Sequence, residues 1–133
     1  MFPPMLHPRA VHHLAIKVCD LALADAFYTR ILGLTVLRRW PAEAGEGDRS
    51  LWLDLGGGAF LALERGTHAR TPLAEEDSGL HLLALCIGRT ERQAWIDRLA
   101  AAGVTPYRQT DFTIYFMDPE GNRIGLSHWP DSA

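Results

Sequence analysis

The chain has 133 residues, of which 47% are hydrophobic and 22% are charged, so it can bury one substantial core as a single domain. Its formal net charge is only −3 and its basic residues are scattered, which argues against a nucleic acid or an anionic membrane as its partner. Its two cysteines are too few for a disulfide framework. The start, MFPPMLHPRA, contains no unbroken apolar run, so we expect no signal peptide or anchor and a cytoplasmic location.

The first half of the chain predicts the element order βαβββ. Residues 11–18 alternate between apolar and polar side chains, as a half-buried strand does. Asp20 then offers an N-cap oxygen to a helix, whose apolar residues recur at helical spacing until Gly33. Three further strands are predicted, at residues 34–40, 50–55 and 59–64.

The second half repeats this order after a polar segment that has neither a strand period nor a helix period. The elements predicted there are a strand at 80–87, a helix at 90–102, a strand at 104–109 and a hairpin of residues 112–117 and 122–129. The sequence therefore predicts one domain over residues 1–133, made of a first module at 11–65, a linker at 66–78 and a second module at 79–130.

An internal repeat supports this division. Residues 12–18 and 81–87 share an apolar period, and each segment precedes a helix that a glycine ends. Repeats of this length are typical of duplicated supersecondary units whose apolar faces need each other. A ferredoxin-type plait is the competing fold, but it does not need two further strands after each helix.

Three motifs give the chain a family resemblance. They are HHLAIKV followed by Asp20-Leu21, Phe27-Tyr28 followed by ILGL, and the stretch YFMDPEGN at residues 115–122. With these motifs the chain resembles the vicinal oxygen chelate superfamily of glyoxalases, bleomycin-resistance proteins and extradiol dioxygenases. The resemblance implies an α+β fold in which two tandem βαβββ modules form a curved mixed sheet around one cavity. It also implies a homodimer.

The resemblance further implies four positions at which a divalent ion would be held by histidine and glutamate. In this sequence those positions fall on His13, Ala62, Leu82 and Gly125. Only His13 has a donor atom, which is too few for a tight site, so we expect no metal cofactor. If zinc, nickel, iron or manganese does bind, the candidate ligands are His13, Glu64 and His81.

The strand period also predicts the residues of a pocket, because alternate side chains point to the same face of a sheet. We expect His13 and Glu64 to act as a general base and its partner if the protein is a catalyst without metal. The predicted ligand-binding residues on the same face are Trp52, Asp54, Phe60, Leu82, Tyr115, Met117 and Arg123. Plain sheet packing of the aromatic residues, and an ion pair of Arg123 with Asp54 or Glu64, are the alternatives.

Two functions follow from this pattern. The first is a small-molecule binding protein of the bleomycin-resistance kind with a degenerate metal site, which sequesters an apolar or aromatic ligand without chemistry. The second is a metal-dependent lyase, isomerase or dioxygenase with non-standard ligands, or a metal-free catalyst that uses His13. A purely structural or regulatory protein is a third reading, and it predicts that the fold has no cavity.

Overall fold

The computed structural model describes residues 5–43, 45 and 47–131. Its first sheet has the strand order β1-β4-β3-β2, in which β1 and β4 are parallel and the other pairs are antiparallel. The strands are β1 (His13–Val18), β2 (Val36–Pro41), β3 (Asp48–Gly56) and β4 (Ala59–Arg65). Each predicted strand of this half is therefore present.

One helix connects β1 to β2. It begins as α1 (Leu21–Asp25), where the side chain of Asp20 accepts a 2.9 Å hydrogen bond from the amide of Leu23, as the predicted cap requires. The helix widens into the π-helical segment η1 (Ala26–Ile31) and ends at Gly33, whose φ of 76° lies in the left-handed region.

The second sheet has the strand order β5-β8-β7-β6, again with its first pair parallel and the others antiparallel. Its elements are β5 (Leu83–Cys86), η2 (Arg89–Glu91), α2 (Arg92–Ala101), β6 (Arg108–Gln109), β7 (Thr113–Met117) and β8 (Arg123–Ser127). The order repeats that of the first sheet, so the predicted α+β fold of two βαβββ modules is confirmed.

Three strands of the second sheet are clearly shorter than predicted, and β8 covers only residues 123–127 of the predicted 122–129. β5 begins at Leu83 instead of residue 80, because its partner β8 begins at Arg123 and leaves the preceding residues without a strand to pair with. β6 covers only residues 108–109 of the predicted 104–109, and Pro106 in the missing part has no amide hydrogen for a ladder.

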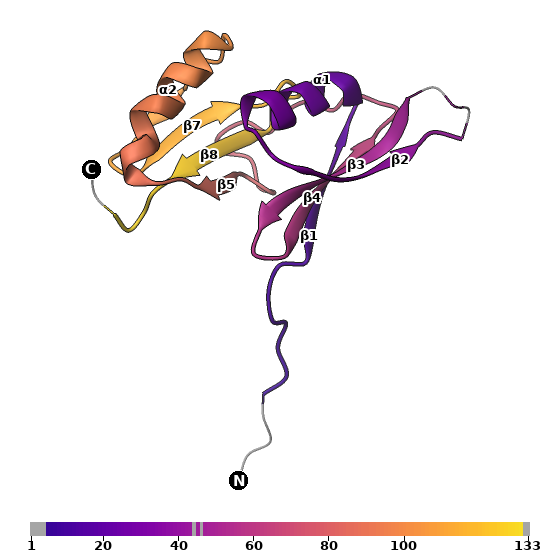
Figure 1. Ribbon diagram of the computed structural model, residues 1–133, viewed down its shortest axis with the longest axis horizontal. Helices are drawn as coiled ribbons and strands as arrows, with labels where there is room; N and C mark the ends of the chain where they lie inside the picture. The colour runs from indigo at the N-terminus through magenta and orange to yellow at the C-terminus, as the bar shows by residue number, and fades with distance from the viewer. Residues whose placement is uncertain (1–4, 44, 46, 132–133) are drawn as a thin grey trace.

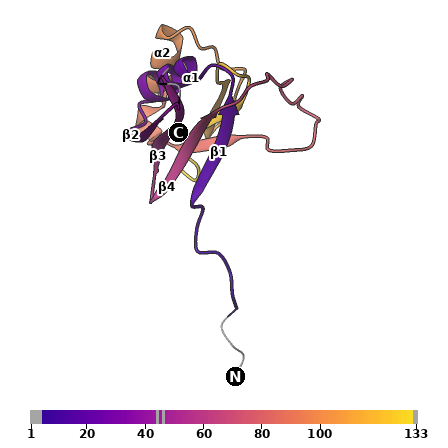
Figure 2. The same cartoon turned by 90° about the vertical axis from the view of Figure 1, so that its right-hand side faces the viewer.

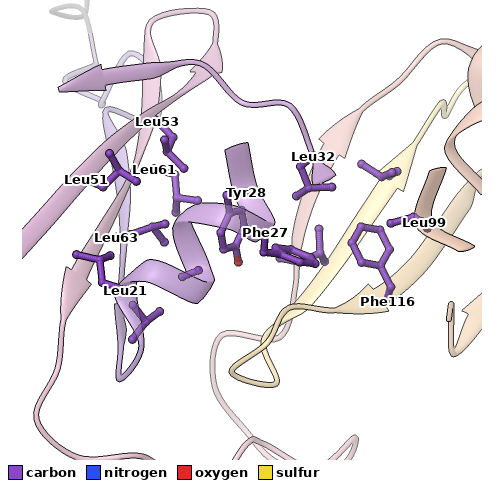
Figure 3. Packing of buried hydrophobic residues seen from close by; sticks show 14 of the residues in the cluster. Leu21, Phe27, Tyr28, Leu32, Leu51, Leu53, Leu61, Leu63, Leu99 and Phe116 are labelled. Atoms are coloured by element: carbon purple, nitrogen blue, oxygen red, sulfur yellow. The ribbon is translucent and has the colours of Figure 1, made fainter. Parts of the chain in front are cut away.

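A shared core joins the two modules. The helix α1–η1 lies between the sheets, and α2 covers β7 and β8 (Figure 1). Figure 3 shows Phe27 pointing from η1 toward Phe116 of β7, with the leucines of the first sheet on the other side of the helix. The ring centroids of Phe27 and Phe116 are 6.2 Å apart. The two sheets are therefore held side by side through one helix.

The linker has no helix or strand, as predicted, and extends from the side of the sheets that faces away from the helices (Figure 2). Arg70 of the linker donates a 2.6 Å hydrogen bond to Oδ1 of Asn122, which lies beside the turn between β7 and β8. Both cysteines are free. Among the described residues, no helix is long and apolar enough to cross a membrane.

Candidate functional site

The open face of the first sheet lies opposite the helix. Along β1 the side chains of His13, Ala15 and Lys17 are exposed, whereas Leu14 and Ile16 are half-buried and pack against the core. This is the alternation that the sequence predicted for β1. His13 therefore lies on the predicted face.

Four rings form a continuous stack on this face. The ring of His13 lies 4.8 Å from that of Phe60 with an interplanar angle of 6°, and Phe60 in turn lies 4.6 Å from Trp52. Trp40 meets Trp52 edge-on at 5.3 Å, and the guanidinium of Arg38 lies 3.6 Å above the Trp40 ring. We call the side chains of His13, Phe60, Trp52 and Trp40 the aromatic face.

The register of the sheet explains the stack. His13 is the strand partner of Phe60, and Trp52 is the partner of Ala62. Ala62 is only 2% exposed although it lies on the open side, because the side chains around it cover its single methyl group. A residue this small leaves room for the neighbouring rings to meet.

His12 also reaches the open face, next to His13. β1 begins at His13, so His12 lies before the strand and is not bound by its alternation. Its Nδ1 is 2.9 Å from Nδ1 of His13, and its ring meets Phe60 edge-on at 5.6 Å. His12 therefore extends the aromatic face.

The structure does not bring Glu64 to His13. Glu64 is the strand partner of Lys17, four residues along β1 from His13, which corresponds to about 13 Å at the usual rise of a strand. The other carboxylate of this face, Asp54, accepts a 2.8 Å hydrogen bond from the amide of Gly56 in the hairpin turn. The catalytic roles of His13 and Glu64 stay predictions.

A cavity of about 520 Å³ lies between the edge of β1 and the start of β5, under the linker. Two of the predicted ligand-binding residues line it, namely Leu82 and Arg123, together with Ala15 and Lys17 of β1. The members of the aromatic face do not line it. The predicted ligand-binding residues thus do not form one pocket: Trp52 and Phe60 belong to the aromatic face, whereas Leu82 and Arg123 line this cavity.

Arg123 has different partners from those predicted. Its Nη2 donates a 2.8 Å hydrogen bond to the carbonyl of Leu73, and its Nε lies 3.4 Å from Oε2 of Glu75. Both partners belong to the linker, whereas the sequence suggested Asp54 or Glu64. An irregular segment has no period that would reveal which of its residues reach a strand, so this contact could not be read from the sequence.

The remaining predicted residues lie on the open face of the second sheet. Tyr115 is the strand partner of Gly125, and a Cβ placed on Gly125 would lie 3.5 Å from the side chain of Leu82. Met117 is the partner of Arg123. These positions follow the predicted alternation, and the half-buried Tyr115 and exposed Met117 remain accessible.

The donor atoms do not fit the ion that the resemblance implies. Within residues 5–43, 45 and 47–131, no three histidine, cysteine, aspartate or glutamate side chains form a group that could hold an ion. The three residues named above as candidate metal ligands lie apart from one another. His13 lies on the aromatic face, Glu64 lies beside Lys17, and Nε2 of His81 lies 3.9 Å from the carboxylate of Glu75. We therefore derive no chemical step through a metal.

Comparison with known proteins identifies the fold and the relatives. Residues 10–126 match the family model described as the Glyoxalase/Bleomycin resistance protein/Dioxygenase superfamily. YaeR of Escherichia coli (strain K12) is 30% identical over 92% of this chain and 98% of its own length. Glutathione transferase FosA of Serratia marcescens is 27% identical over 89% of this chain and 79% of its own length.

Among solved structures, a glyoxalase/dioxygenase from Nostoc punctiforme superimposes with a TM-score of 0.78 and 23% identity. The match covers 98% of this chain and 100% of that protein. At this identity the likeness concerns the fold, and it agrees with the repeated strand order of the two sheets.

Proposed function

Because the chain belongs to the glyoxalase/bleomycin resistance protein/dioxygenase superfamily, we propose that it is a small-molecule binding protein whose ligand stacks on the aromatic face. The observation that supports this proposal is the row of rings from His13 to Trp40 on the open side of the sheet. A planar apolar or aromatic ligand gains both apolar burial and ring stacking on such a surface. The proposal needs no metal, and three of the four ion positions have no donor.

The aromatic face suits binding because its rings are held by a sheet. Each ring is on β1, β2, β3 or β4, so strand pairing fixes its position before a ligand arrives. A preorganised surface loses little conformational entropy when it binds.

The direct test uses the neutral planar dye Nile red, whose fluorescence reports an apolar environment. Replacing Trp52 by alanine removes the centre of the stack, and we expect the affinity to fall about 10- to 100-fold, the equivalent of one buried aromatic side chain. Trp129→Ala is the matched control, since Trp129 is 71% exposed and lies outside every strand. Equal dye affinities of the two variants would refute the proposal.

An enzymatic function is the second candidate, and the likeness to a glutathione transferase favours it. In this reading His13 is the general base, because histidine is the side chain that most often transfers protons in catalysis. The test is consumption of glutathione with 1-chloro-2,4-dinitrobenzene as the second substrate, in the wild type and in His13→Gln. Consumption that depends on His13 would replace the binding proposal by an enzymatic one.

A second copy of the chain is the partner that we propose. The open aromatic face is half-exposed in the single chain, and Leu80, Leu82 and Met117 are exposed apolar side chains of the second module. Exposed apolar surface of this kind is typical of interaction sites. Sedimentation velocity over a concentration series tests the proposal, and a single monomeric species at every concentration would refute it.

A further inference from the structure

The cavity between β1 and β5 has aliphatic walls. Its volume of about 520 Å³ lies within the usual range for small-molecule sites, roughly 300–1,000 Å³. The larger apolar side chains among its lining residues are Leu14, Ile16, Leu73, Leu80, Leu82, Leu83 and Ile124. None of these is aromatic, so the walls favour an aliphatic body over a stacked ring.

Three charged side chains of the cavity are cationic. They are Lys17, Arg70 and Arg123. The carboxylate of Glu120 also lines it, but its two oxygens accept hydrogen bonds from the amides of Cys19 at 2.8 Å and Asp20 at 3.3 Å. The free positive charge of the cavity therefore favours an anion.

Arg123 is the most buried of these three cations. The residue is 8% exposed, and its Nε is buried without a hydrogen bond. Its only side-chain hydrogen bond among the described residues runs from Nη2 to the carbonyl of Leu73. A buried guanidinium is costly unless an anion compensates it, so this group is poised to accept a carboxylate.

A side chain of the linker already lies over this group. The turn of residues 74–77 is closed by a 2.7 Å hydrogen bond from the amide of Ala74 to Oδ2 of Asp77, and it presents Glu75. The Glu75 carboxylate lies 3.4 Å from Nε of Arg123 and 3.9 Å from Nε2 of His81. Both distances exceed the 2.7–2.9 Å typical of a charge-assisted hydrogen bond, and the Glu75 side chain is 61% exposed.

We infer that the cavity binds a small carboxylic acid with an aliphatic body, whose carboxylate takes the place of the Glu75 carboxylate on Arg123. Glu75 shows the chemistry that the site accepts, and its loose, exposed contact allows it to be displaced. The aliphatic body lies along the leucine and isoleucine walls. This site is separate from the aromatic face, so the inference does not depend on what that face binds.

Calorimetric titration with octanoate tests the inference, with 1-octanol as the uncharged probe of the same chain length. We expect octanoate to bind the wild type at least 10-fold more tightly than 1-octanol, because only octanoate can compensate Arg123. Glu75→Gln removes the competing carboxylate and should tighten octanoate binding about two- to five-fold, the range of one exposed ion pair.

Glu76→Gln is the matched control. It removes the same charge from the same turn, and no ion pair of Glu76 is found in the described part of the chain. A general change in net charge would affect both variants equally, whereas displacement of Glu75 affects only Glu75→Gln. Equal octanoate affinities of the two variants, or equal affinities of octanoate and 1-octanol for the wild type, would overturn the inference.

Arg123→Gln should weaken octanoate binding at least 10-fold and leave 1-octanol binding unchanged. If that buried substitution prevents folding, the pair Glu75→Gln and Glu76→Gln still decides the question, because both positions are exposed. Trp52→Ala should not change octanoate binding, and Glu75→Gln should not change Nile red binding. The failure of one proposal is therefore distinguishable from the failure of the other.

Discussion

The hydroxyl of Tyr28 donates a 2.6 Å hydrogen bond to Oδ2 of Asp118, and this buried bond connects the helix of the first module to the β7–β8 turn of the second. Oδ1 of Asp118 also accepts hydrogen bonds from the amides of Glu120 at 2.9 Å and Asn122 at 2.8 Å. Glu120 in turn accepts from the amides of Cys19 and Asp20, before α1. The DPEGN stretch that indicated the family therefore joins the two modules.

Tyr28→Phe should lower the free energy of unfolding by about 1–3 kcal/mol, because it leaves a buried acceptor on Asp118 with one donor fewer. Urea denaturation measures the loss. Tyr107→Phe is the control. Because Tyr107 is exposed, loss of its hydroxyl should change the free energy of unfolding by no more than about 0.5 kcal/mol. A Tyr28→Phe protein as stable as the control would show that the bond adds nothing to the docking of the modules.

Stability should also fall at alkaline pH through the same tyrosine. Burial, and then the adjacent carboxylate of Asp118, raise the pKa of Tyr28 far above its ordinary value of 10.0. The unfolded chain releases this proton near pH 10 while the folded chain keeps it, so the stabilisation is complete below pH 10 and is lost above it. The expected slope is about 1.4 kcal/mol per pH unit. Urea denaturation between pH 9 and 11 should show a smaller slope in Tyr28→Phe, and identical slopes would contradict this assignment.

Much of the fold was predictable because local signals agree with it. Alternating side chains marked the strands, and Gly33 and Gly103 marked the ends of the helices. The prediction was wrong where pairing depends on a distant partner. β5 begins only where β8 offers a partner, and Pro106 leaves the segment before β6 without a donor.

The candidate site was predictable only in its regular part. Alternation placed His13, Trp52 and Phe60 on one face, but it missed Trp40. Between Val36 and Arg38 of β2 the register shifts by one residue, so Val36 pairs with Leu53 whereas Arg38 pairs with Trp52. Such a bulge turns the following side chains, Trp40 included, to the other face. The contact of Glu75 with Arg123 was not predicted, because the linker has neither a strand period nor a helix period.

Divalent metals should not stabilise the protein. Ala62, Leu82 and Gly125 stand where the family resemblance implies donors, and a single histidine is too few for a tight site. Thermal melts after chelator treatment, with nickel, zinc, iron or manganese added in a concentration series, should show no rise in Tm, since an ion that binds only the folded state would raise it. A rise that His13→Gln abolishes would contradict the prediction and identify a metal site on the aromatic face.

Gly121→Ala should destabilise the protein more than Gly57→Ala. Both glycines have a positive φ, of 84° and 62°, so each alanine pays the left-handed backbone cost of about 1–2 kcal/mol. A Cβ on Gly121 would also lie 2.6 Å from Cγ of Pro72, whereas nothing lies within 4 Å of a Cβ on Gly57.

The difference between the two losses therefore measures how firmly the linker packs against the β7–β8 turn, and we expect about 1–3 kcal/mol from overpacking. Urea denaturation of both variants gives it directly. Because Pro72 precedes Leu73, whose carbonyl accepts from Arg123, a displaced linker should also change octanoate affinity in Gly121→Ala and not in Gly57→Ala. Equal losses of stability in the two variants would mean that the linker moves aside freely and does not fix Glu75 over the cavity.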